Sequence, residues 1–302
     1  MIRSSGMQKC LTKQNRGRFP MLFYALNYSR FMTNIDTSQY KKIIEETFDG
    51  VSTRYDENKF FAISAKRMAE LVPSFEIMNV LDVSTGTGAV AIEVARKHHH
   101  ANIEGIDLSL GMLKQAKNKA QNEGLNKITF KQCDIENIPY ANEAFDVVTC
   151  GYALFFYPDM EATYQAICKI IKRDGIFVFS SFTNDAFNPY AELFLQRLEV
   201  DYKTEAPSRL RERLKTKPQI EELVALSKHK SVNIELYPIR YSITIKEWWS
   251  LLNNAGYKSL LDQLNTEQFA QFKQEHLREI ESISVDGVIE LNTDTLFGVV
   301  YV

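Results

Sequence analysis

The segment 79–91, Asn-Val-Leu-Asp-Val-Ser-Thr-Gly-Thr-Gly-Ala-Val-Ala, constrains the fold more than any other part of the chain. A short apolar run ends at the carboxylate Asp82, a turn of small residues contains Gly86 and Gly88, and a helical pattern follows. Glycine lacks the Cβ that would block a close approach, so such a turn can place backbone N–H groups and a helix N-terminus against a ligand. The pattern therefore predicts a strand, a ligand-binding turn and a helix in succession.

Two nucleotide-type cofactors fit such a turn. Gly86, Gly88 and Ala91 satisfy the loose dinucleotide pattern G-x-G-x-x-G/A, and Asp107 follows at about the right distance for a ribose hydroxyl. However, Asp82 stands two residues before the turn, where its negative charge would repel a pyrophosphate. A cofactor that carries an ammonium and a sulfonium would be attracted instead, which favours S-adenosylmethionine.

Further motifs follow the turn in the order found in the class I S-adenosylmethionine-dependent methyltransferases, which this chain resembles. The turn from Asp82 to Gly88 is similar to the family motif Asp/Glu-x-Gly-x-Gly-x-Gly, with Ser84 in place of the first glycine. Residues 103–113 resemble the family's second strand with its acidic end, and residues 132–135 resemble the end of its third strand. Residues 144–154 resemble its fourth strand, and residues 170–178 resemble its fifth strand with the turn before it. Residues 48–56, Phe-Asp-Gly-Val-Ser-Thr-Arg-Tyr-Asp, resemble the motif Phe-Asp-x-x-Ala-x-x-Tyr-Asp at the start of quinone-biosynthesis C-methyltransferases. The resemblance covers about residues 43–182 and indicates the ubiquinone/menaquinone-biosynthesis-like, or type 11, group.

This resemblance implies S-adenosylmethionine as the cofactor and gives roles to residues at the strand ends. Asp82 would meet the amino end of the methionyl group, Asp107 would accept both ribose hydroxyls, and Asp134 would take the adenine amino group. The other cofactor-binding residues that it implies are Tyr55, Ser84, Thr85, Gly86, Gly88, Leu108, Met112, Cys133, Ile135, Cys150, Gly151 and Tyr152. Methyl transfer needs a general base only if the acceptor atom carries a proton. The catalytic residue therefore stays open, with Tyr55 and Tyr152 as candidates, and no metal is expected.

Short apolar strands alternate with helical stretches between residues 79 and 181, which predicts βαβ units and a parallel sheet. Strands are expected at about 79–83, 102–107, 127–132, 145–150 and 175–181, and helices are expected to begin near Gly88, Ser109 and Asp159. Ligands of open α/β sheets bind beyond the carboxyl ends of the strands, which is where the pattern puts Asp82, Asp107, Asp134 and Cys150. Together with the resemblance, this predicts an α/β fold: a Rossmann-like, doubly wound, mostly parallel seven-stranded sheet with an antiparallel last strand and a helical cap.

The chain is expected to divide into four regions. These are a basic N-terminal extension over 1–35, a cofactor-binding core over 36–182, a helical cap insertion over 183–230, and a region over 231–302 whose last strands and substrate-side helices complete the core. Residues 232–245 alternate like one strand, and 288–302 are predicted to form the last strand. The extension has no acidic residue before Asp36, which is compatible with an organellar targeting segment, a disordered tail or an over-long gene prediction. A further reading is that its aromatic residues help to close the substrate pocket.

Composition argues against several other classes of protein. A net charge of −2 over 302 residues gives no overall electrostatic footprint for nucleic acid. The four cysteines, Cys10, Cys133, Cys150 and Cys168, lack C-x-x-C spacing and are typical of reduced thiols. No apolar run approaches the roughly 20 residues that span a bilayer. We therefore expect a cytoplasmic location, with an organelle as the alternative, a small-molecule substrate and no nucleic-acid partner; no oligomeric state follows.

Aromatic residues dominate the candidates for a substrate pocket. They are Tyr55, Phe61, Tyr152, Phe155, Phe156, Tyr157, Phe187, Tyr190, Phe194, Trp248 and Trp249. Related small-molecule enzymes often carry His-His where this chain has Phe155-Phe156, so a plausible base is replaced by apolar wall. Enzymes that methylate DNA amino groups have Asn/Asp-Pro-Pro-Tyr at the fourth strand end, where this chain has Cys-Gly-Tyr-Ala over 150–153. These features predict a small, apolar or aromatic metabolite as the methyl acceptor.

Three other functions stay open at this point. They are a methyltransferase fold that binds without turnover, a nicotinamide-dependent oxidoreductase, and an RNA or protein methyltransferase with a basic groove built from the N-terminal extension and Arg209, Arg211 and Arg213. A metal site at 98–100 is disfavoured, because consecutive histidines on a helix cannot all face one ion. We expect those histidines at a solvated helix end, and His276 at an exposed helix position.

Overall fold

The computed structural model describes residues 37–76, 78–204 and 213–302. Contacts divide the chain into the units Met1–Lys41 and Lys42–Val302, and both sheets belong entirely to the second unit. The basic segment 1–35 lies outside the described residues, as do Arg209 and Arg211, and what is expected of them stays a prediction. None of the described helices is long and apolar enough to cross a membrane.

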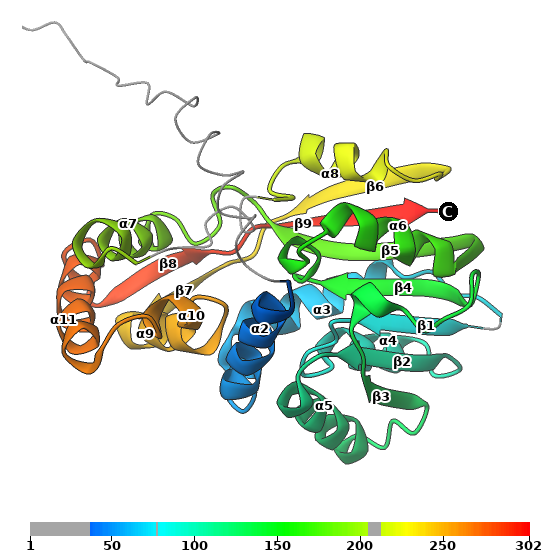
Figure 1. Ribbon diagram of the computed structural model, residues 1–302, viewed down its shortest axis with the longest axis horizontal. Coiled ribbons are helices and arrows are strands. Elements are labelled where there is room, and N and C mark those ends of the chain that lie inside the picture. Colours follow the sequence, from blue (N-terminus) through cyan, green and yellow to red (C-terminus); the bar gives the residue numbers. More distant parts are fainter. Residues whose placement is uncertain (1–36, 77, 205–212) are drawn as a thin grey trace, which may run out of the picture. The chain divides into compact units, whose positions relative to one another are not determined.

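A seven-stranded sheet forms the centre of the second unit, with the strand order β3-β2-β1-β4-β5-β9-β6 (Figure 1). Its strands are β1 Asn79–Val83, β2 Asn102–Asp107, β3 Ile128–Gln132, β4 Phe145–Gly151, β5 Ile171–Phe182, β6 Ser231–Tyr237 and β9 Thr295–Tyr301. Strands β1 to β5 pair in parallel, whereas β9 runs antiparallel to both β5 and β6. The predicted Rossmann-like sheet with an antiparallel last strand is confirmed, although β5 begins four residues earlier than expected.

Helices cover both faces of this sheet, because successive strand residues point to opposite sides. Leu81 packs in a core with helices α6 (Met160–Ile170) and α8 (Lys217–Val224). Its neighbour Val80 packs in a second core with α3 (Lys59–Leu71) and α4 (Ala89–Lys97). Helix α5 (Leu110–Asn122) covers β2 and β3. This doubly wound arrangement leaves the carboxyl ends of β1, β2 and β4 available for a site.

The three predicted helix starts are confirmed by the N-cap residues. Gly88 caps α4, Ser109 caps α5 by accepting the Met112 N–H, and Asp159 caps α6 by accepting the Ala162 N–H. At Ser109 and Asp159, short side-chain oxygens satisfy N–H groups that the first helical turn leaves unpaired, whereas Gly88 makes no side-chain cap. The remaining segments before α6 are α2 (Thr37–Val51) and 3-10 turns at Tyr55–Glu57, Ile135–Asn137 and Leu154–Phe156.

A second, aromatic lobe is built on a two-stranded antiparallel sheet of β7 (Arg240–Thr244) and β8 (Val288–Asn292). Its helices are α7 (Tyr190–Tyr202), α9 (Ile245–Asn254), α10 (Lys258–Leu261) and α11 (Thr266–Ser282). Figure 1 shows these elements together on the left, apart from β1 to β4. Within the segment 183–230, α7 belongs to this lobe, whereas α8 packs against β6 and β9.

Two single-strand predictions are wrong. Residues 232–245 form β6 and β7, and residues 288–302 form β8 and β9, in two different sheets. Between the sheets, Asp294 accepts the Ile239 N–H at 3.1 Å and pairs with the Arg240 guanidinium. Pro238 precedes this point and has no N–H to continue a strand ladder. The chain therefore leaves one sheet and enters the other at this crossing, although the residue pattern alternates throughout.

Two histidine predictions are also wrong. His98 is buried rather than solvated, with its Nε2 3.2 Å from the Val72 carbonyl oxygen, while His99 and His100 are exposed. His276 is fully buried in the aromatic lobe, and its Nε2 accepts the indole N–H of Trp248 at 3.0 Å. His276 lies between Phe272 and Ile280 at spacings of four, so it shares the one face of α11 that is buried. His98 is the C-cap residue of α4. The described residues contain no cluster of three or more His, Cys, Asp or Glu that could hold a metal ion.

Candidate cofactor site at the glycine-rich turn

The turn after β1 has a backbone that only a few residue types adopt easily. Ser84, Gly86 and Gly88 have φ values of +50°, +55° and +80°, in the left-handed region that glycine enters without cost. A Cβ on Gly88 would lie 2.9 Å from the Cβ of Ala116, so α4 and α5 approach closely there. A Cβ on Gly86 would meet nothing within 4 Å, so that side of the turn faces open space.

Asp82 lies buried beneath this turn and is held by two threonines. Its Oδ1 accepts the Thr149 hydroxyl and its Oδ2 accepts the Thr85 hydroxyl, both at 2.6 Å. Burial raises the pKa of Asp82 to about 6, and the two threonine hydrogen bonds oppose that rise. The carboxylate therefore fixes the turn to β4 and presents a negative charge near neutral pH.

Asp107, at the end of β2, is the second carboxylate at the turn. Its Oδ2 accepts the backbone N–H of Gly86 at 2.8 Å and its Oδ1 accepts that of Ser109 at 2.9 Å. Burial raises its pKa to about 6 as well, against the pull of these backbone donors. The Cys133 N–H donates to the Asp107 carbonyl at 3.0 Å, so the ends of β2 and β3 also meet here.

Two further carboxylates connect the N-terminal helical segment to this region. Asp56 accepts the Thr87 hydroxyl at 2.6 Å and the Lys119 ammonium at 2.8 Å. Asp49 accepts the Gly111 N–H at 2.8 Å and also the Ser109 hydroxyl. The segment before α3 is thereby held over the carboxyl edge of the sheet.

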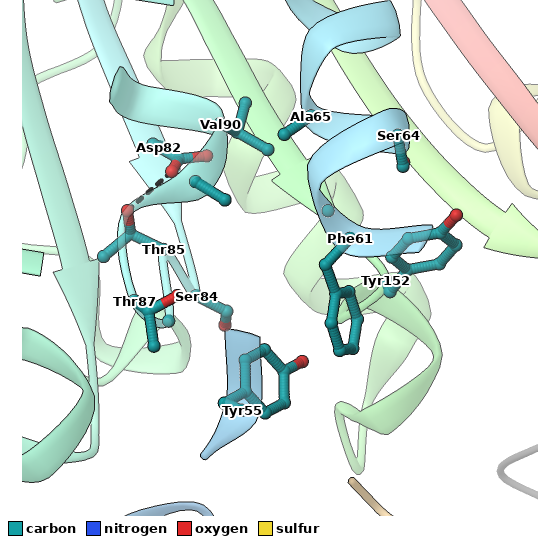
Figure 2. Close-up of a pocket in the computed structure, with 13 residues that line it drawn as sticks. Tyr55, Phe61, Ser64, Ala65, Asp82, Ser84, Thr85, Thr87, Val90 and Tyr152 are labelled. Atoms are coloured by element: carbon teal, nitrogen blue, oxygen red, sulfur yellow. Dashed lines mark hydrogen bonds between the residues drawn. The ribbon is translucent and has the colours of Figure 1, made fainter. Parts of the chain in front are cut away.

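A hollow of about 450 Å³, counted with its open mouth, lies between the turn and α3 (Figure 2). It is lined by Tyr55, Phe61, Ser64, Ala65, Asp82, Ser84, Thr85, Gly86, Thr87, Ala89, Val90, Gly151 and Tyr152. Among these described lining residues there is no lysine, arginine or histidine. The hollow therefore combines one buried carboxylate, several hydroxyls and an aromatic side.

Two tyrosines line the hollow and a third, Tyr157, contacts the lining residue Ser84 from outside it. The ring of Tyr55 stacks on Phe61 with centroids 4.3 Å apart. The Tyr152 hydroxyl lies 2.7 Å from the Thr295 hydroxyl, and the Tyr157 hydroxyl lies 2.8 Å from that of Ser84. Burial is the main cause that raises the pKa of all three phenols, so each stays protonated at neutral pH.

The structure brings part of the predicted cofactor set to the hollow. Seven of those residues line it: Tyr55, Asp82, Ser84, Thr85, Gly86, Gly151 and Tyr152. Leu108, Cys133 and Asp134 lie partly exposed at the neighbouring strand ends, and Asp107 contacts the turn directly. The side chains of Met112, Ile135 and Cys150 are buried, and those of Ile135 and Cys150 belong to the core with α6 and α8.

Several lining residues were missed by the site prediction. Thr87, Ala89 and Val90 adjoin the turn, and their proximity in the sequence was a usable signal. Ser64 and Ala65 come from α3, and no local pattern marks them because packing alone brings α3 to the turn. Of the predicted aromatic candidates, only Tyr55, Phe61 and Tyr152 line the hollow. Arg213, expected in a basic groove, donates to the Tyr157 carbonyl at 3.1 Å.

Comparison with known proteins matches the part of the chain that carries this site. The family model described as a methyltransferase domain matches residues 74–256, more than half of the chain. Aklanonic acid methyltransferase DauC of Streptomyces sp. (strain C5) is 29% identical over 48% of this chain and 67% of its own length. The ubiquinone/menaquinone biosynthesis C-methyltransferase UbiE of Bartonella quintana is 28% identical over 53% of this chain and 65% of its own length.

Among solved structures, the YcgJ protein of Bacillus subtilis has a similar fold, with a TM-score of 0.53 and 17% identity. That likeness covers 79% of this chain and 98% of YcgJ. At this identity it supports the fold alone.

Proposed function

This chain belongs to the methyltransferase domain family and is a class I methyltransferase that depends on S-adenosylmethionine; on that premise, we propose that it methylates a small, apolar or aromatic metabolite beside the glycine-rich turn. The observation that carries the proposal is the hollow itself, in which the turn, the carboxylate of Asp82 and an aromatic side lie together, while Asp107 is hydrogen-bonded to the turn. A dinucleotide would have to place its pyrophosphate against Asp82, whose charge opposes it.

The residues present fit the cofactor. Gly86 leaves open space where a Cβ would stand, so a ligand can approach the backbone of the turn. Asp107 is oriented by two backbone donors, and each of its oxygens has a lone pair left for a ribose hydroxyl. Asp82 supplies negative charge near a sulfonium and an ammonium. We propose cofactor contacts for Tyr55, Asp82, Ser84, Thr85, Gly86, Gly88, Asp107, Leu108, Met112, Cys133, Asp134, Ile135, Cys150, Gly151 and Tyr152.

The protein contributes mainly position and a dry environment to the reaction. When bound, the cofactor supplies a methyl group on a positively charged sulfur, and that sulfur is an already activated leaving group. The aromatic faces of Tyr55 and Phe61 suit such a cation, and their apolar surroundings exclude water. Both catalytic candidates, Tyr55 and Tyr152, stay protonated and so do not act as bases at neutral pH. The Tyr55 hydroxyl can donate a hydrogen bond, whereas the Tyr152 hydroxyl already bonds that of Thr295.

The lining supports an uncharged acceptor. No cationic side chain among the described lining residues would hold a phosphate or carboxylate, and Asp82, the one acidic lining residue, already accepts two hydroxyls. The two named relatives act on aklanonic acid and in ubiquinone/menaquinone biosynthesis. The aromatic side of the lining supports an acceptor with a flat, apolar body.

Calorimetric titration tests the cofactor half of this proposal. We expect micromolar binding of S-adenosylmethionine and S-adenosylhomocysteine, and no binding of NAD. Asp107→Ala should weaken the binding of both sulfur compounds at least tenfold. The control Asp146→Ala removes a carboxylate at the opposite end of β4, where it pairs with Lys172, and should leave binding unchanged. Binding of NAD alone, or equal effects of the two substitutions, would contradict the proposal.

A further inference from the structure

Ser64 of α3 has a buried hydroxyl without a hydrogen-bond partner. The residue is 1% exposed, and its Oγ makes no hydrogen bond of ordinary geometry in the described part of the chain. A buried hydroxyl that makes no hydrogen bond costs free energy, so such groups are rare unless a ligand or water satisfies them. Ser64 lines the hollow, which is therefore where its partner would lie.

The nearest polar group, the phenol of Tyr152, has already committed its proton. The Thr295 hydroxyl donates to the Thr293 carbonyl at 2.9 Å, so at 2.7 Å it accepts the proton of Tyr152. Ser64 lies close enough to lower the pKa of Tyr152, yet the two hydroxyls form no hydrogen bond of ordinary geometry. The Ser64 hydroxyl is therefore without a well-formed hydrogen bond in the described part of the chain, and a ligand in the hollow could supply one.

The surroundings of Ser64 select the kind of ligand. Figure 2 shows Ser64 and Tyr152 on the side of the hollow away from Asp82, Thr85 and Thr87, with Phe61 beside them. The neighbouring lining residues Ala65 and Val90 are apolar. A charged ligand group would lose its hydration there without gaining a counter-ion. A neutral oxygen on a flat ring would gain both the hydroxyl and the aromatic contacts.

We propose that Ser64 determines acceptor specificity by donating a hydrogen bond to a neutral oxygen, a phenolic hydroxyl or a carbonyl, on a flat aromatic acceptor. The inference rests on the proposed function, because it places the cofactor along the turn and the acceptor at the α3 side. It names a polar contact that the apolar character of the acceptor alone would not require.

Matched naphthalenes test this inference on protein saturated with S-adenosylhomocysteine. Calorimetry compares 1-naphthol with 1-methylnaphthalene, which has a similar shape but no oxygen. We expect 1-naphthol to bind about fivefold to tenfold more tightly, the gain of about one hydrogen bond. Ser64→Ala should abolish this preference. The affinities for 1-methylnaphthalene and for S-adenosylhomocysteine should each stay within twofold of those of the unchanged protein. Alanine also favours a helix more than serine does, so the variant should fold.

Two control variants separate the hydroxyl from general effects. Ser227→Ala removes a serine that bonds Tyr164 in the core with α6 and should keep the preference for 1-naphthol. Phe61→Leu removes an aromatic wall. It should weaken the binding of both naphthalenes by the same factor, so that the ratio of their affinities is kept.

The outcomes distinguish this inference from the proposed function. No binding of S-adenosylhomocysteine overturns both. Binding of S-adenosylhomocysteine with equal affinity for the two naphthalenes, or with neither bound, overturns the inference alone. A further outcome is that Ser64→Ala weakens the binding of S-adenosylhomocysteine more than about threefold while the preference for 1-naphthol persists. In that case the hydroxyl serves the cofactor, and the inference is overturned.

Discussion

The backbone N–H of Gly86 donates to Asp107 Oδ2 at 2.8 Å, and this bond joins the glycine-rich turn after β1 to the end of β2. The other oxygen of Asp107 accepts the Ser109 N–H, so two backbone donors fix the orientation of the carboxylate before any ligand arrives. Preorganisation of this kind lowers the cost of binding, because no side chain has to be ordered on contact.

Affinity for S-adenosylhomocysteine should depend on pH through Asp107. Because its pKa is raised to about 6, the carboxyl is largely protonated at pH 5 and cannot accept both ribose hydroxyls. We expect affinity to rise about tenfold from pH 5 to pH 7, as follows from the loss of one proton on binding. Calorimetry on Asp107→Asn should show weaker binding and a shallower pH dependence, with Asp82 accounting for the remaining slope. The same slope in both proteins would refute the assignment.

Substitutions at Ser84 should reveal a balance between backbone strain and a hydrogen bond. Its φ of +50° costs about 1 kcal/mol for a residue with a Cβ, and its hydroxyl bonds Tyr157. Ser84→Ala keeps the strain and loses the bond, so the free energy of unfolding should fall by about 1 kcal/mol. Ser84→Gly loses both the strain and the bond, so its free energy of unfolding should stay near that of the unchanged protein. Urea unfolding checks this, and equal stability of the two variants would show that the strain is absent.

The two glycines of the turn should respond differently to alanine. At Gly86 the added Cβ meets nothing within 4 Å, so only the strain of about 1 kcal/mol applies, while S-adenosylhomocysteine should bind at least tenfold more weakly. At Gly88 the Cβ would lie 2.9 Å from that of Ala116, and overlap should raise the loss of stability to about 2–4 kcal/mol. Thermal unfolding and calorimetry on both variants measure the two effects. Unimpaired binding by Gly86→Ala would place the ligand elsewhere.

His276 should make the protein less stable in acid. Burial, followed by the charge of Arg197, lowers its pKa to about 4 from the ordinary 6.5. Between these values the unfolded chain binds a proton that the folded protein excludes, so the stabilising contribution is present above pH 6.5 and lost as the pH falls towards 4. The loss should reach about 3 kcal/mol.

The variant His276→Gln isolates this contribution. Its amide oxygen can still accept the Trp248 N–H, but it does not titrate. Urea unfolding from pH 4.5 to 7 should therefore show a smaller fall in stability for the variant, because all other titrating groups are common to both proteins. Parallel curves would mean that His276 does not contribute.

The core of the fold and the turn of the site can be predicted from the residues alone. Alternating apolar stretches predict β1 to β5, and capping residues such as Ser109 and Asp159 predict where helices begin. The glycines and Asp82 mark the turn because its backbone angles and close contacts restrict which residues fit there. These are local properties, which a short stretch of chain expresses through its own sterics and hydrogen bonds.

The remaining features arise from packing between distant parts of the chain. This packing placed Ser64 of α3 at the hollow, joined Tyr152 to Thr295 across 143 residues, buried His276 against Trp248, and divided two alternating segments between two sheets at the Arg240–Asp294 pair. Each of these outcomes depends on which surfaces pack together over long separations in the chain. Burial and the completion of hydrogen bonds select such contacts from the whole molecule, and no local pattern of residues records that selection.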